Sequence, residues 1–418
     1  RCTSTSYAAV SSLRSRLSLC PQFSLSACLI QHSSALHAWQ SHLLLMSQRL
    51  GVNKKGSLKA GIGVVGRIKA VGAETSLLRL SFTLRSVREQ DRCCIMGSKV
   101  EEGGYSRKQK MRYTERVEDA EGIYILDTEQ FGLPKYGSLY ILKAPRPAII
   151  ETGFSHTVPK VLSALAGLQI KPEEVAYIMP THVHLDHAGG AGFLAEVCSN
   201  AQVVIHEKGA EHLIEPIRLV ESVKRAVGVM FAYYGEVKPI PADRVIRVRG
   251  GEKFDLGNGL LIEAMDTPGH APHHACFYER KNKVLFVGDA VGIYRPFAKD
   301  ALLPTTPPPS FHLEQSLETL ERLKRLDLNA LCFTHWGVYK NIKLLDGYAS
   351  LLKFWVAEIE ATKKKLSDDE KVKQYFVDKH GPELAKLYDP MMVRGEIEMN
   401  VQGVLLYLKR REQGASQV

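Results

Sequence analysis

Residues 181–190 read Thr-His-Val-His-Leu-Asp-His-Ala-Gly-Gly, and this stretch decides the fold. Three histidines and a carboxylate fall within six residues, and no other stretch of the chain is so dense in metal ligands. Imidazole binds zinc and other borderline metals, and a carboxylate can complete a second site beside the first. The segment 174–180 before it predicts a buried strand that ends at a proline. We therefore expect metal ligands on a loop at a strand end; the alternative is a chance histidine cluster on a polar loop.

Three further candidate ligands follow predicted strands later in the chain. His270 ends the motif Asp-Thr-Pro-Gly-His, Asp289 ends Leu-Phe-Val-Gly-Asp, and His335 ends Leu-Cys-Phe-Thr-His. Each motif follows an apolar run that is consistent with a buried strand. One such motif indicates little by itself, whereas four motifs in this order favour one metal centre over a chance cluster.

At these residues the chain resembles the metallo-β-lactamase-fold hydrolases, whose signature is His-x-His-x-Asp-His. The resemblance covers about residues 110–340 and implies an α/β (α+β) fold, a four-layer αββα sandwich. It also implies two metal sites. The ligands of the first metal would be His182, His184 and His270, and those of the second would be Asp186, His187 and His335. Asp289 would be the carboxylate that bridges the two metals. Two dications lower the pKa of a shared water toward neutrality and supply a hydroxide nucleophile. Asp186 is implied as the catalytic residue that orients this water or relays a proton.

Residues at three positions indicate which branch of this family the chain resembles most. Asp289 stands where the antibiotic-degrading enzymes have a cysteine ligand, and His184 stands where the oxygen-reducing diiron branch has a glutamate. The first family motif is usually Asp-x-Gly, whereas this chain has Glu151 followed by Thr-Gly. The family's carboxylate is structural there, so we expect a different support beneath the ligand loop and retained activity. These features and the proline-rich loop 305–309 resemble stand-alone prokaryotic members whose substrates are poorly defined.

Composition separates a basic leader from a nearly neutral remainder. The chain has 418 residues, 45% of them hydrophobic and 24% charged, which is typical of a globular protein. Residues 1–100 hold 14 Lys+Arg and 3 Asp+Glu, which leaves 41 basic and 42 acidic residues in 101–418. The net charge of +10 therefore belongs to the leader, and we expect no nucleic acid as a partner.

The leader, residues 1–95, is rich in Ser, Leu and Arg and has no acidic residue before Glu74. This composition is typical of an organelle transit peptide; the alternative is translated upstream sequence before a start at Met96. Three of the eight cysteines lie beyond it: Cys198, Cys276 and Cys332. We expect them to be buried and reduced, which favours the cytoplasm, with the mitochondrion or plastid as alternatives if the leader is genuine. No stretch is long and apolar enough to cross a membrane.

Beyond the leader we predict a hydrolase domain over 110–340 and a helical extension over 341–418. Hydrophobic spacing predicts a helix over 158–167 and a helical insert over 209–236 that would line the substrate mouth. Further helices are expected over 312–326, 341–365, 368–380 and 393–411. The last three could form a cap on the sandwich, a surface for a homodimer partner, or a lid over the metals.

Four residues near the motifs need separate interpretation. Tyr294 follows the proposed bridging carboxylate and is our candidate for a substrate-binding phenol, with simple packing as the alternative. His206 ends a predicted strand, and we expect a structural role for it. Either His273 or His274 is expected to support the metal ligands, because metal-bound imidazoles need an oriented hydrogen-bond partner.

The resemblance implies a dinuclear zinc hydrolase that acts on a small ester-like substrate. A thioester is the leading substrate class, as in hydroxyacylglutathione hydrolase (glyoxalase II); a lactone or β-lactam would need the same machinery. Iron or manganese could replace zinc, because histidine and carboxylate accept all three metals. A mononuclear-iron sulfur dioxygenase is an alternative from another class. The near-neutral charge of residues 101–418 disfavours a nuclease, and the complete ligand set disfavours a non-catalytic binding protein.

Overall fold

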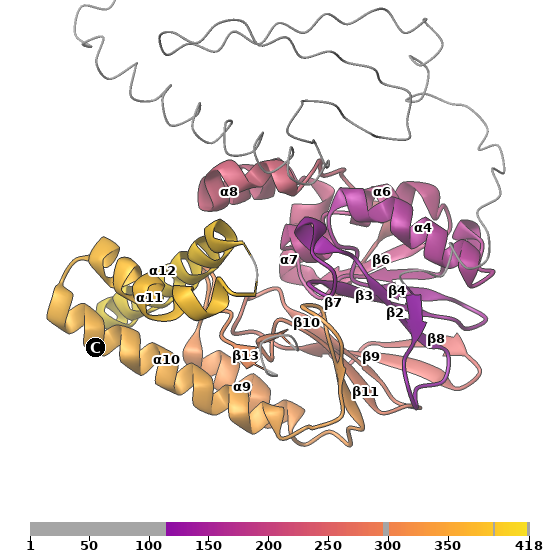
Figure 1. The fold of residues 1–418 in the computed structure, drawn as a ribbon. Coiled ribbons are helices and arrows are strands. Elements are labelled where there is room, and N and C mark those ends of the chain that lie inside the picture. The colour runs from indigo at the N-terminus through magenta and orange to yellow at the C-terminus, as the bar shows by residue number, and fades with distance from the viewer. Residues whose placement is uncertain (1–113, 296–300, 388, 416–418) are drawn as a thin grey trace, which may run out of the picture. The chain divides into compact units, whose positions relative to one another are not determined.

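Two β-sheets lie face to face in the computed structural model, which describes residues 114–295, 301–387 and 389–415 (Figure 1). The first sheet contains, in order across it, β1 (Thr114–Arg116), β2 (Ile123–Asp127), β3 (Ser138–Leu142), β4 (Ala148–Ile150), β5 (Tyr177–Met179), β6 (Gln202–His206) and β7 (Val245–Val248). Neighbours from β1 to β4 are antiparallel, and those from β4 to β7 are parallel. The predictions for the leader lie outside the described residues.

The second sheet has a mixed arrangement. Its strands, in order across it, are β15 (Val338–Tyr339), β14 (Ala330–Phe333), β11 (Val284–Gly288), β10 (Ala275–Glu279), β9 (Leu260–Asp266) and β8 (Lys253–Gly257). Strands β11 and β14 are parallel, and the other neighbours are antiparallel. A separate antiparallel pair consists of β12 (Ile293–Arg295) and β13 (Ala301–Leu303).

Alternating side chains explain why both faces of each sheet are covered. In β6, Val203 and Ile205 belong to the apolar cluster under the helices, whereas Val204 belongs to the cluster between the sheets. The second sheet contributes Phe277 and Phe286 to the same inter-sheet cluster. Full burial of such a side chain stabilises the fold by about 1.5–3 kcal/mol. These buried layers hold the two sheets together as a sandwich.

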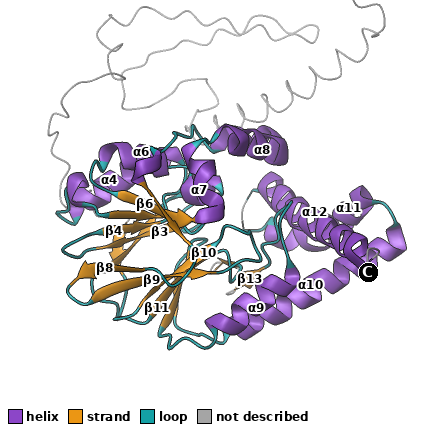
Figure 2. Ribbon diagram, turned by 180° about the vertical axis from the view of Figure 1, so that it is seen from behind, coloured by secondary structure: helices purple, strands orange, loops and turns teal. Residues whose placement is uncertain are grey.

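Helices cover the outer face of each sheet (Figure 2). The helices are α4 (Val158–Gly167), α5 (Leu185–Ala188), α6 (Ala191–Val197), α7 (Glu207–Ile214), α8 (Ile217–Val227), α9 (Leu313–Leu323), α10 (Leu344–Leu366), α11 (Asp369–Leu384) and α12 (Pro390–Ala415). Side chains of α4, α6 and α7 share one cluster with the first sheet, and side chains of α9 to α12 share another with the second. The four layers confirm the predicted αββα sandwich with a helical C-terminal region. Within the described residues, none of these helices combines the length and apolar character that crossing a membrane requires.

Strand direction brings the sequence motifs to one edge of the sandwich. The parallel strands β4 and β5 end beside each other in the first sheet. In the second sheet β9, β11 and β14 run in one direction, because β10 is antiparallel to β9 and β11, and β14 is parallel to β11. Each of these five strands is followed directly by a motif quoted above. The carboxyl ends of the strands therefore position the candidate site.

The segment 209–236, which was predicted to be helical, consists of several helices. The helical insert 209–236 is divided into α7, α8 and a 3-10 helix over Gly228–Tyr233. Pro216 lies between the two α-helices as the N-cap of α8, and a proline has no N–H to continue the preceding helix. The helices predicted over 158–167, 341–365 and 368–380 agree with α4, α10 and α11 to within a few residues. The domain boundaries at 95, 110 and 340 stay predictions.

Candidate metal centre

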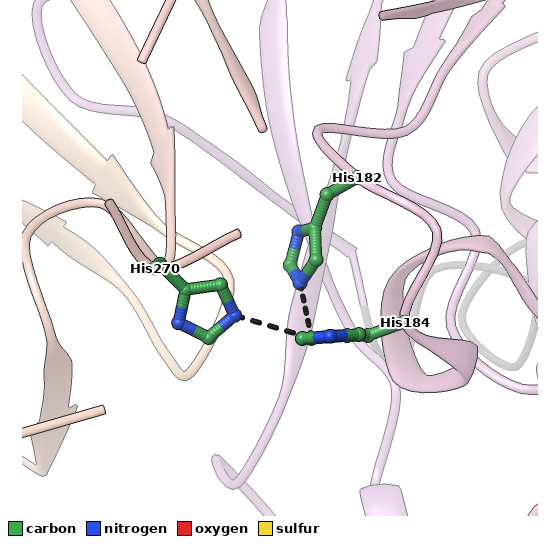
Figure 3. A group of neighbouring side chains, drawn as sticks. All are labelled: His182, His184 and His270. Atoms are coloured by element: carbon green, nitrogen blue, oxygen red, sulfur yellow. Dashed lines mark hydrogen bonds between the residues drawn. The ribbon is translucent and has the colours of Figure 1, made fainter. Parts of the chain in front are cut away.

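The first group of candidate ligands is three histidines from two loops (Figure 3). His182 and His184 follow β5, and His270 follows β9. The Nδ1 atom of His184 lies 2.8 Å from Nε2 of His182 and 3.1 Å from Nε2 of His270. His182 and His270 are buried, whereas His184 is half-buried. Three imidazole nitrogens therefore face one point.

The second group lies next to the first and shares a carboxylate with it. Nε2 of His335 lies 3.5 Å from Oδ2 of Asp186 and 3.3 Å from Oδ1 of Asp289. Nε2 of His187 lies 3.7 Å from Oδ2 of Asp186 and 3.4 Å from Oδ1 of Asp289. The other Asp289 oxygen, Oδ2, lies 3.5 Å from Nε2 of His270 in the first group. Asp289 is therefore placed between the two groups, as a bridging ligand would be.

Glu151 forms hydrogen bonds with residues of and beside the second group and so holds its loops in place. Its Oε1 atom accepts a hydrogen bond from Oγ1 of Thr181 at 2.6 Å and from Oγ1 of Thr334 at 2.9 Å, and it lies 2.9 Å from Nδ1 of His187. Its Oε2 atom accepts from the Thr181 N–H at 3.1 Å. A carboxylate at Nδ1 directs the other nitrogen of His187 toward the centre. The expected structural role of this position is therefore visible, with glutamate in place of aspartate.

His274 supports the bridging carboxylate. Its Nε2 atom accepts the backbone N–H of Asp289 at 3.1 Å, so its Nδ1 carries the proton and lies 2.8 Å from Oγ1 of Thr267. Burial, together with the nearby imidazole of His270, lowers the pKa of His274 well below its usual range, which keeps the ring neutral. Of the two histidines considered in the sequence, His274 thus makes the supporting contact.

Thr305 joins two of the candidate ligands. Its Oγ1 atom lies 3.2 Å from Nδ1 of His270 and donates to Oδ2 of Asp289 at 3.4 Å. Its carbonyl oxygen also lies 3.4 Å from Nδ1 of His270. Thr305 begins the proline-rich loop 305–309, and no sequence motif indicated a contact between this residue and the ligands. A contact between a loop and a ligand 35 residues away leaves no signal in a single sequence.

The electrostatics of the histidines differ within the site. Burial, followed by repulsion between neighbouring imidazoles, lowers the pKa of His182 and His184 well below its usual range. They are therefore neutral, which is the form that binds a metal ion. Burial also lowers the pKa of His187, but the negative charges of Glu151, Asp289 and Asp186 outweigh burial and raise this pKa to about 10. A metal ion bound at His187 would have to displace that proton.

The donor set fits a pair of metal ions. Among the described residues, the buried atoms His187 Nε2 and Asp289 Oδ1 face each other and have no hydrogen-bond partner. Buried polar atoms are almost always satisfied, so unsatisfied atoms that converge fit a bound cation. Five histidines and two carboxylates provide the ligand types that zinc binds. The assignment of the seven residues as ligands stays a prediction that this geometry supports.

Two other residues considered in the sequence, Tyr294 and His206, make packing and capping contacts. Tyr294 is 6% exposed and packs against Phe333 and Tyr339, with ring centroids 5.6 and 4.8 Å apart. A substrate contact for Tyr294 stays a prediction, and its burial favours the packing alternative. His206 caps α7 by accepting the N–H of Lys208.

A known protein family matches the same part of the chain that builds this site. The sequence profile of the Metallo-beta-lactamase superfamily matches residues 142–335, which begin in β3 and end at the last candidate ligand. Residues 142–335 form a metallo-beta-lactamase superfamily domain. Members of this superfamily are mostly metal-dependent hydrolases, although some are other kinds of enzyme.

Similar proteins are found among archaea and bacteria. A metallo-beta-lactamase fold-containing protein of Sulfurisphaera tokodaii is 29% identical over 222 residues, which are 52% of this chain and 79% of that protein. A solved structure of an archaeal metallo-beta-lactamase superfamily protein from Sulfolobus tokodaii has a TM-score of 0.51 at 25% identity and covers 68% of this chain and 98% of its own. Hydroxyacylglutathione hydrolase of Rhodopseudomonas palustris is 28% identical over 133 residues, which are 32% of this chain and 40% of that enzyme. The chain thus spans less than half of this named hydrolase.

Proposed function

We propose that this protein is a dinuclear metal-dependent hydrolase, with zinc as the metal. The observation that carries the proposal is the position of Asp289. Its Oδ2 lies 3.5 Å from Nε2 of His270 in the first group, and its Oδ1 lies 3.4 and 3.3 Å from Nε2 of His187 and of His335 in the second. A pair of dications held there would supply a hydroxide at neutral pH and polarise the bond to be cleaved. The side chain of Asp186 is 23% exposed, so it can contact both the buried centre and a molecule arriving from solvent.

Residues of this chain provide the remaining parts of a hydrolytic site. Asp186 would orient the attacking water and carry its proton to the leaving group, as a positioned carboxylate does in general acid–base catalysis. Glu151, His274 and Thr305 hold the ligands in fixed orientations through their hydrogen bonds. Orientation fixed before the substrate binds reduces the barrier, because the site needs no rearrangement in the transition state.

We propose a small thioester as the substrate. The similarity to hydroxyacylglutathione hydrolase over 133 residues supports this class, since that enzyme's name specifies a glutathione thioester. A lactone or β-lactam would need the same water and the same carboxylate. The nearly equal numbers of basic and acidic residues in 101–418 support a small molecule over nucleic acid. Burial of Cys198, Cys276 and Cys332 as free thiols supports a reducing compartment such as the cytoplasm.

The test combines metal analysis with a substrate panel on the full chain. We expect about two zinc ions per chain, in line with the two ligand groups, together with turnover of a thioester. One iron per chain with oxygen consumption on a persulfide would instead identify a mononuclear-iron sulfur dioxygenase. Turnover of a lactone or β-lactam without thioester turnover would keep the hydrolase and replace the substrate class.

Single substitutions connect activity to the proposed centre. Asp289→Ala and His184→Ala should abolish hydrolysis while circular dichroism remains that of the unaltered protein, because each removes one metal ligand at the end of a strand. Tyr278→Phe is a matched control, since the Tyr278 hydroxyl donates to the Asp327 carbonyl at 2.9 Å and contacts none of the ligands. Unchanged turnover in either ligand variant would refute the assignment.

A further inference from the structure

The loop that carries Thr305 is held by two C-terminal helices. On α10, the hydroxyl of Tyr348 accepts the Thr305 N–H at 3.3 Å, and Nε1 of Trp355 donates to Oγ1 of Thr306 at 3.3 Å. On α12, Asn400 accepts the Thr306 N–H with its side chain and the Thr306 hydroxyl with its backbone carbonyl, the latter at 2.8 Å. All five residues are buried. Because these hydrogen bonds are buried, their loss is not compensated by water.

The contacts of α12 follow one face of the helix. Asn400, Gly403, Tyr407 and Arg410 are spaced by three or four residues, which places them on the same side. A Cβ at Gly403 would lie 1.9 Å from the Thr306 carbonyl oxygen, so helix and loop are in direct backbone contact. Tyr407 packs on Phe311 with ring centroids 5.7 Å apart, and Arg410 donates to the Phe311 carbonyl at 2.7 Å. Helix α12 therefore contacts the loop from Thr306 to Phe311.

Within the loop from Thr305 to Phe311, Thr305 is the residue that contacts the candidate ligands. Thr305 contacts His270 and Asp289, and it is the neighbour of Thr306, which α12 holds. Tyr348 also packs beside the turn that follows Asp289, since a Cβ at Gly292 would lie 2.4 Å from Cε2 of Tyr348. Two consecutive hydrogen bonds thus connect α10 to the candidate ligands through Thr305, and α12 reaches the same ligands through its hydrogen bonds to Thr306 and the peptide bond between Thr305 and Thr306.

We infer that Tyr348 and Asn400 are positioning residues for the metal centre, which they reach through Thr305 and Thr306. The C-terminal helices then belong to the catalytic apparatus, since they fix the orientation of His270 and Asp289. Contacts around metal ligands commonly alter metal affinity by 10- to 100-fold when removed. The inference rests on the proposed function, in that the seven residues must bind metal.

The test measures the affinity of the metal-free full chain for cobalt, by competition with a coloured chelator. Tyr348→Phe removes the acceptor of the Thr305 N–H and keeps the ring, so we expect cobalt to bind about 10-fold more weakly. Asn400→Leu removes the side-chain acceptor of the Thr306 N–H and keeps the backbone acceptor of its hydroxyl, and it should weaken binding by a similar factor. The absorption spectrum of bound cobalt should change as well, because the orientation of His270 changes. Tyr278→Phe is the matched control, which loses a tyrosine hydrogen bond away from the loop.

The outcomes separate this inference from the proposed function. Weaker cobalt binding in both variants, with the control unchanged, supports the positioning role. Cobalt affinity and spectrum equal to those of the unaltered protein would overturn it, even if thermal unfolding of the metal-free variants occurs at a lower temperature. If the unaltered protein binds no cobalt and no zinc, the proposed function fails and this inference fails with it.

Discussion

Glu151 shows how one side chain can organise several motifs. Its carboxylate contacts the loop after β5 at Thr181 and His187 and the loop after β14 at Thr334. The residue itself has a φ of 67°, a left-handed conformation that is uncommon for a residue with a Cβ. Such a conformation persists where the surroundings over-determine it, and here four hydrogen-bonding contacts do so. The longer glutamate therefore replaces the aspartate of the family motif without losing the link to the ligand loop.

The charge of Glu151 predicts a specific pH dependence in the metal-free protein. The pKa of His187 is raised to about 10, above the ordinary value of 6.5, so its protonation stabilises the fold at neutral pH, and this stabilisation is lost as pH rises through about 10. Glu151→Gln removes the negative charge that raises the pKa of His187 most, so this pKa should fall. We expect the variant to be less stable than the unaltered protein near pH 7, with the difference shrinking toward about pH 10. Urea unfolding in the presence of a chelator measures this; a difference that does not vary with pH would contradict it.

At the scale of elements, periodicity and strand ends predicted most of what positions the site. The strand before residues 181–190 and the helix over 158–167 follow from apolar spacing, and the ligands follow from residue types at strand ends. The antiparallel pair of β12 and β13 was not predicted from the sequence. The contacts of Thr305 with His270 and of Asn400 with Thr306 were not predictable either. They join segments that are 35 and 94 residues apart, and an isolated threonine or asparagine has no distinctive pattern.

Two glycines of α12 provide a comparison within one helix. A Cβ at Gly403 would meet the backbone of the Thr306 loop, whereas a Cβ at Gly395 would meet nothing within 4 Å. Gly395→Ala should stabilise the protein by up to about 1 kcal/mol, because alanine favours the helix. Gly403→Ala should destabilise it by about 1–3 kcal/mol, because the added methyl forces helix and loop apart. Urea unfolding of the two variants gives both values. A stabilising Gly403→Ala would show that α12 does not press on the loop.

At the scale of the whole described chain, the candidate metal centre lies at the edge of the sandwich where strand ends of both sheets converge. His182, His184 and His187 come from the first sheet's β5 loop, and the other ligand loops come from the second sheet. The sheets are also joined near the site without metal, because the Tyr140 hydroxyl donates to the Phe333 carbonyl at 2.7 Å. A bound cation would therefore hold together segments from both halves of the sandwich, and unfolding of either half would release it.

This arrangement predicts that metal stabilises the entire domain. Zinc that binds the folded chain and not the unfolded chain raises the free energy of unfolding by about 2.7 kcal/mol at 100 times its dissociation constant. The melting temperature should therefore rise with zinc concentration and fall on chelation, and one cooperative transition should remain, because both sheets contribute ligands. Calorimetry of the full chain at several zinc concentrations measures the shift, with Asp289→Ala as the variant whose shift should be strongly reduced. His187 and Asp289 are buried in the folded chain, so a cation bound between them must stabilise the folded state. A melting temperature that does not depend on zinc would therefore mean that these two residues do not bind a cation.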